Sequence, residues 1–87
     1  MKISETLEEF KTHRGMHATF RMVACLGLLS RADFKSQLRE YCYMRNIKLD
    51  MTEMGGWFVQ KVGIRCEGTV EDLEPLLNWF QRIGMDK

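Results

Sequence analysis

The pattern of hydrophobic and polar residues along the chain predicts six elements, in the order helix, strand, helix, strand, strand, helix. The first is a short helix over residues 4–14. Thr6 and Glu9 have the spacing of a capping box there, and Gly15 can end a helix in a left-handed conformation. We interpret residues 1–15 as an N-terminal helical extension.

Residues 17–27 fit two different periods. With a period of two, alternate residues are apolar and form the inner face of a half-buried strand: Ala18, Phe20, Met22, Ala24 and Leu26. With a period of 3.6, another set shares one side of a helix: Met16, Phe20, Val23 and Gly27. We favour the strand, and the alternative is a second helix that forms a hairpin with the first.

The next helix is expected to begin at Arg31 and to end at Asn46. Ser30 and Asp33 have the Ser-x-x-acid spacing of a helix start, and asparagine tolerates the left-handed conformation that ends helices. One apolar stripe should face the core, and it consists of Phe34, Leu38, Tyr41 and Cys42. Three charged residues between these positions are expected to face solvent: Lys35, Arg39 and Glu40.

Two runs of β-forming residues, 47–52 and 57–66, are joined through Gly55-Gly56 and predict a β-hairpin. One side of the second run is expected to face the core: Phe58, Val62, Ile64 and Cys66. The opposite side carries Trp57, Val59, Lys61 and Arg65. Gln60 falls on the apolar side, which is typical of a bulge or a sheet edge.

The last helix is expected to begin close to Glu71, after Gly68 and Thr69, and to end at Gly84. Its apolar stripe consists of Leu73, Leu76, Leu77, Phe80 and Ile83. Three acidic residues near its start are expected to interact with the positive end of the helix dipole and not to act as catalytic groups: Glu71, Asp72 and Glu74. Trp79 lies outside the apolar stripe, and we expect it to be exposed as a candidate contact residue.

These elements predict one domain over residues 1–87, with a βαββα core over residues 16–87. The fold class is α+β: a small two-layer sandwich with an antiparallel-type three-stranded sheet, helices on one face and an added N-terminal helix. This is an incomplete ferredoxin-like unit that lacks its last strand. The hairpin and last helix broadly resemble the end of an acylphosphatase domain. The chain lacks that family's arginine loop after the first strand and a recognisable catalytic asparagine, so the resemblance implies no activity.

Composition adds little until the charges are placed along the chain. The 87 residues contain 13 Lys and Arg against 12 Asp and Glu, a net charge of +1. From Lys11 to Lys48, however, eight basic and two acidic residues give +6, and four acids without a base lie between Glu67 and Glu74. This asymmetry is compatible with an acidic ligand and equally with self-association.

The remaining chemical signals are weak. Cys25, Cys42 and Cys66 form no CxxC pair, so we expect small buried hydrophobes in a reducing compartment. His13 and His17 are four residues apart, but Gly15 separates them and no third metal ligand follows at a matching spacing. No run approaches the ~18 apolar residues of a membrane span. The prediction is a cytoplasmic protein without a cofactor, a metal or a membrane partner.

An uncovered sheet face is the main functional expectation from the sequence. If both helices cover one side of a three-stranded sheet, the other side presents a mixture of basic, aliphatic and aromatic residues. The candidate binding residues are Arg21, Lys48, Trp57, Val59, Lys61 and Arg65, with Trp79 as a separate contact. Because a small core often recruits a partner surface, we predict a non-enzymatic binding module, homodimeric through this face.

Three alternatives stay open. A nucleic-acid-binding protein would use the basic sheet face, although only one aromatic residue is available there to stack bases. A protein partner other than a second copy would use the same surface. A small enzyme or a ligand-binding pocket is the third alternative, and no catalytic motif in the chain supports it.

Overall fold

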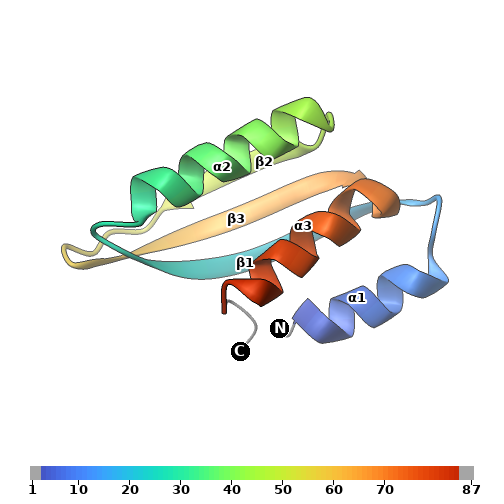
Figure 1. The fold of residues 1–87 in the computed structure, drawn as a ribbon, viewed down its shortest axis with the longest axis horizontal. Helices are drawn as coiled ribbons and strands as arrows, with labels where there is room; N and C mark the ends of the chain where they lie inside the picture. Colours follow the sequence, from blue (N-terminus) through green and yellow to red (C-terminus); the bar gives the residue numbers. More distant parts are fainter. Residues whose placement is uncertain (1–2, 85–87) are drawn as a thin grey trace.

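The computed structural model describes residues 3–84, which form the six predicted elements in the predicted order. They are α1 (Ile3–Thr12), β1 (His17–Gly27), α2 (Arg31–Met44), β2 (Lys48–Glu53), β3 (Val59–Thr69) and α3 (Val70–Arg82). Figure 1 shows α2 and α3 side by side over the sheet, with α1 alongside α3. The predicted α+β class, with an antiparallel three-stranded sheet and an added N-terminal helix, is confirmed.

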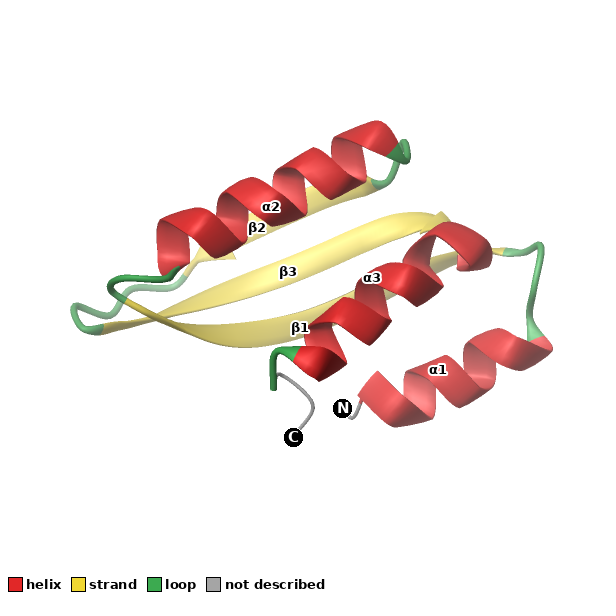
Figure 2. Cartoon of the chain, in the orientation of Figure 1, coloured by secondary structure: helices red, strands yellow, loops and turns green. Residues whose placement is uncertain are grey.

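The strands are ordered β1-β3-β2, and both pairs are antiparallel. The central strand is therefore β3, whose Cys66 lies opposite Phe20 of β1 and opposite Leu49 of β2. β2 and β3 form the predicted hairpin, whereas α2 connects β1 to β2 (Figure 2). As a result β1 and β2 both lie at edges of the sheet.

The strand interpretation of residues 17–27 is confirmed, because alternate side chains of β1 enter the core. Phe20, Ala24 and Leu26 are buried, whereas the odd-numbered residues between them are exposed. The ring of Phe20 stacks on Phe80 of α3, with 6.1 Å between the ring centroids. Burial of apolar side chains between the sheet and the helices is the main stabilising contribution in a domain of this size.

The ends of the helices depart from the expected capping. Thr6 lies inside α1, which begins at Ile3, so the proposed capping box is not a helix start. Ser30 immediately precedes α2, as predicted, but its side chain makes no capping hydrogen bond. Thr69 does cap α3, because its hydroxyl accepts a hydrogen bond from the backbone N–H of Asp72.

The prediction that Lys35 faces solvent is wrong, because this residue is only 8% exposed. Its ammonium group donates hydrogen bonds to the carboxylate of Glu53 and, at 2.8 Å, to the amide oxygen of Gln60. The hydrogen bond from Lys35 explains how the polar side chain of Gln60 is accommodated on the inner side of β3. The hydrogen bond and the charge of Lys35 also hold the pKa of the Glu53 carboxyl below its usual value.

The oppositely charged segments of the chain partly neutralise one another within the molecule. Arg14 pairs with Glu74 at 2.9 Å, and Arg45 lies 3.9 Å from Asp72. The hydroxyl of Tyr41 donates a hydrogen bond to the backbone carbonyl of Asp72 and so ties α2 to α3. Burial raises the pKa of this phenol. Within residues 3–84, no helix has the length and apolar character needed to cross a membrane.

Candidate functional site

One face of the sheet carries no helix among the described residues, and we call it the open face. It consists of the outward-facing residues of the three strands. They are His17, Thr19, Arg21, Val23 and Cys25 of β1, Lys48, Asp50 and Thr52 of β2, and Val59, Lys61, Gly63, Arg65, Glu67 and Thr69 of β3. Five of the predicted binding residues therefore share this face: Arg21, Lys48, Val59, Lys61 and Arg65.

The register of the strands sets three charged residues in a row across the middle of the open face. Arg21 lies opposite Arg65, and Arg65 lies opposite Asp50. The Arg65 guanidinium is 3.9 Å from the Asp50 carboxylate and 3.4 Å from that of Glu67. Arg65 is thus neutralised within the molecule.

Arg21 lacks such compensation. It is exposed, and within residues 3–84 no carboxylate lies within ion-pair distance of it. Like charges directly opposite each other in neighbouring strands are destabilising. The pairing of Arg21 with Arg65 therefore leaves a cation on the open face that favours an acidic group from outside the protomer.

One end of the open face is mainly apolar. Val23 is 58% exposed and lies opposite Gly63, and Val59 is exposed further along the sheet, opposite Gly27. The side chain of Met54 extends over Gly63, where an added Cβ would lie 3.7 Å from Met54 Cε. The end of the open face beyond Arg21 and Arg65 is therefore mainly apolar, and Lys61 is the charged residue within it.

The loop between β2 and β3 borders the apolar end. Gly55 and Gly56 both have positive φ values there, of 90° and 108°. Trp57 and Phe58 follow and are 80% and 72% exposed. The prediction that Phe58 faces the core is wrong, because β3 begins only at Val59 and the loop carries both aromatic rings into solvent. The Arg31 guanidinium donates to the Trp57 carbonyl at 3.1 Å and so ties this loop to the start of α2.

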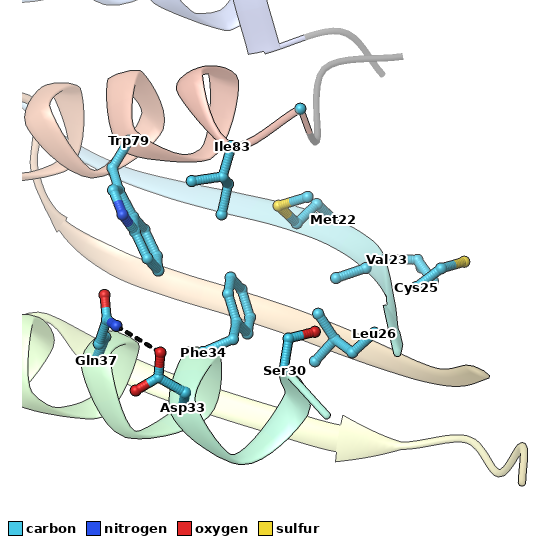
Figure 3. Close-up of a pocket in the computed structure, with 12 residues that line it drawn as sticks. Met22, Val23, Cys25, Leu26, Ser30, Asp33, Phe34, Gln37, Trp79 and Ile83 are labelled. Atoms are coloured by element: carbon cyan, nitrogen blue, oxygen red, sulfur yellow. Dashed lines mark hydrogen bonds between the residues drawn. The ribbon is translucent and has the colours of Figure 1, made fainter. Parts of the chain in front are cut away.

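The prediction of an exposed Trp79 also requires correction. Trp79 is half-buried, and its ring stacks on Phe34 of α2 with a centroid distance of 5.3 Å and an angle of 10° between the planes. A helix wheel of α3 places Trp79 outside the stripe, but its ring lies between α2 and α3, where it contacts Phe34 (Figure 3). Trp79 therefore belongs to a different surface from Trp57.

Trp79 and Phe34 border a groove of about 520 Å³ between α2, α3 and β1, which Figure 3 shows in close-up. Met22, Ala24 and Leu26 of β1 contribute apolar side chains to it, and Ile83 lines it at the end of α3. Its polar lining residues come from α2 and the turn before it: Ser30, Asp33 and Gln37. Sequence analysis missed this groove, because its walls come from three elements that are far apart in the chain.

The three cysteines occupy different environments. Cys42 and Cys66 are buried, as predicted, whereas Cys25 is exposed on the open face, and so the expectation of burial is wrong for it. A hydrogen bond with Cys42 and burial both raise the pKa of the Cys66 thiol. Cys66 is therefore a packing residue with an unreactive thiol.

No metal centre is apparent in residues 3–84, where no group of three or more potential ligands comes together. His13 does not act with His17 on one helix face, because α1 ends at Thr12 and His17 begins β1. The Nδ1 atom of His13 instead lies 2.9 Å from the backbone carbonyl oxygen of Glu9.

Fold and surface together define a class: a small two-layer α+β domain with one open sheet face and a groove between its two covering helices. In comparisons with known proteins, no family model, curated protein or solved structure matches the chain.

Proposed function

We propose that the protein is a small interaction module that forms a homodimer by packing the open faces of two copies against each other. The observation that carries this proposal is Arg21, a cation without an acidic partner among residues 3–84, in the middle of a sheet face that no helix of these residues covers. The mainly apolar end of the same face, with Val23 and Val59, provides surface whose burial favours association.

Two-fold symmetry supplies the missing partner for Arg21. β1 and β2 lie on opposite sides of β3, and so a two-fold axis along the strand direction places β1 of one copy over β2 of the other. Arg21 then meets the partner's Asp50, and the pairing occurs twice. Arg65 near the axis keeps its own carboxylates, Asp50 and Glu67. Lys61 can extend its long side chain to the edge of such an interface.

The size of the face predicts how strong this association is. β1 and β3 have 11 residues each and β2 has 6, so the three strands give a face of roughly 450 Å² for each copy. The total of about 900 Å² is below the ~1,200–2,000 Å² of stable interfaces and is typical of weak association. We therefore expect a dimer that dissociates in the micromolar range, and not an obligate dimer.

Reciprocal charge exchange tests the proposal. Arg21→Asp should abolish dimerisation, because it faces Asp50 of the partner with a like charge. Asp50→Arg should do the same, and the double variant R21D/D50R should restore the dimer. Sedimentation equilibrium at protein concentrations from about 1 to 200 μM measures the association across the range in which we expect it.

A matched control uses Arg39 and Glu40, which are exposed on α2 on the opposite side of the molecule. Arg39→Glu and Glu40→Arg should leave the association unchanged. A wild-type chain that stays at its own mass of 10.3 kDa over the whole range would contradict the proposal. A double variant that associates no more strongly than either single variant would also contradict it.

Binding of nucleic acid by this face has less support. Of its six charged residues, Asp50 and Glu67 are acidic and neutralise Arg65, which removes one of the cations that would bind phosphates. Trp57 lies in the loop between β2 and β3 and not on the sheet, so it offers no stacking platform within the basic surface.

A further inference from the structure

The outer edge of β1 is an unpaired backbone surface. β1 has 11 residues and, among residues 3–84, pairs only with β3. In an antiparallel strand every second residue directs its N–H and C=O away from its neighbour. Within the described part of the chain, no hydrogen bond from another element to the main chain of β1 is present. Long open edges of this kind are templates for an additional strand.

The groove between the helices lies on this same edge strand. Five consecutive residues of β1, Met22 to Leu26, line it, so the groove follows the main chain as well as the inner side chains. Phe34, Trp79 and Ile83 form its apolar walls (Figure 3). Its volume of about 520 Å³ is within the ordinary range for binding sites and is ample for one long side chain.

The charge of the groove indicates which side chain fits. Asp33 is the only charged residue among those that line it, and it is exposed. Its carboxylate accepts a hydrogen bond of 2.9 Å from the amide of Gln37. Among residues 3–84, no cation lies within ion-pair distance of Asp33. The groove thus offers aromatic and aliphatic walls together with one uncompensated negative charge.

We propose that β1 binds an extended peptide segment of a partner protein as a fourth strand, and that this segment inserts an arginine or lysine side chain into the groove. The peptide backbone pairs with the open N–H and C=O groups of β1, which supplies affinity. The apolar stem of the inserted side chain packs between Phe34, Trp79 and Ile83, and its cationic end meets Asp33. The site differs from the proposed dimer interface, because it uses the edge of the sheet and the helix side, and it shares only Val23 and Cys25 with the open face.

A capped heptapeptide with the sequence Thr-Val-Thr-Arg-Thr-Val-Thr provides the probe. Threonine and valine favour the extended conformation, and every second side chain points toward the helix side. Titration into ¹⁵N-labelled protein should shift the amide signals of residues 22–27 and the indole signal of Trp79. A peptide with glutamate in place of the central arginine should bind at least about tenfold more weakly, because it faces Asp33 with a like charge.

Variants of the protein assign the cation preference to one residue. Asp33→Asn should reduce the difference between the arginine and glutamate peptides to less than about threefold. Glu5→Gln removes the same charge from an exposed position on α1 and should leave the difference unchanged. Equal binding of the two peptides to the wild type, or an unchanged preference in Asp33→Asn, would overturn the role of Asp33.

N-methylated peptides test the pairing with β1. One peptide carries N-methyl groups on its threonines, and a second carries them on the remaining residues. Strand addition requires the N–H groups of only one set, so one peptide should lose binding and the other should retain it. The proposal is overturned if both bind alike, if no peptide binds, or if a second copy protects the β1 amides at rising protein concentration without peptide.

Discussion

Replacing Gly56 by alanine should destabilise the protein far more than the same change at Gly55. Both glycines have positive φ values, which L-residues adopt at a cost of about 1–2 kcal/mol. Their surroundings differ. An added Cβ at Gly55 meets no atom within 4 Å, whereas one at Gly56 would lie 1.9 Å from the backbone oxygen of Val59 and 2.9 Å from its carbonyl carbon. The overlap at Gly56 is with backbone, and so a change of side-chain rotamer cannot relieve it.

The loop must therefore move, and its hydrogen bonds show what the movement costs. The backbone N–H of Lys61 donates to the carbonyl of Gly55 at 3.1 Å, and Arg31 donates to the carbonyl of Trp57 at 3.1 Å. Each such bond contributes about 1 kcal/mol, so with the conformational cost G56A should lose about 2–4 kcal/mol, against about 1 kcal/mol for G55A. For a domain of this size, the Tm should fall by roughly 10–25 °C in G56A and by about 4–8 °C in G55A.

Thermal unfolding followed by circular dichroism measures both variants against the wild type. The total stability expected for 87 residues is about 4–13 kcal/mol, so G56A should remain largely folded at low temperature and give a complete transition. A Tm for G56A equal to or above that of G55A would refute the steric reasoning. It would mean that the loop holding Trp57 and Phe58 adapts at no cost.

Two further predictions concern buried polar groups. In the native state, a thiol reagent such as DTNB should modify one cysteine per chain, Cys25, and in denaturant it should modify all three. The variant Cys25→Ser should react only after unfolding. Rapid labelling of Cys42 or Cys66 in the native state would contradict their burial. Lys35→Met should lose about 1–2 kcal/mol in denaturant unfolding, because Gln60 on the inner side of β3 loses its donor. Arg39→Met on the solvent side of the same helix should change stability by less than about 0.5 kcal/mol, and similar losses in both variants would show that the Lys35 contact contributes nothing.

The fold could be predicted from the sequence wherever one residue period dominates. The alternation of Phe20, Ala24 and Leu26 with exposed residues identified β1, and the Gly55-Gly56 pair located the hairpin. The predictions failed where a contact between distant elements decides the outcome. Lys35 is a solvent residue on a helix wheel, but its long stem reaches Glu53 and Gln60 across the sheet edge. Trp79 is outside the stripe of α3, but Phe34 of α2 provides a stacking surface for it.

For the candidate surfaces too, the residue period along a strand predicts which face a side chain is on, whereas its neighbours on that face follow only from the register between strands. Alternation along β1 and β3 is enough to place Arg21 and Arg65 on the open face. It does not show that they lie directly opposite each other, with Asp50 beside Arg65 and no acid beside Arg21. That pairing depends on the order β1-β3-β2, which local patterns do not specify because α2 and β2 separate β1 from β3 in the chain. The same order leaves β1 at an edge with one unpaired side. The open face and the groove are therefore two consequences of the position of one strand. Arg21 belongs to the open face, the inner side chains of Met22 and Leu26 line the groove, and Val23 belongs to the open face and also borders the groove.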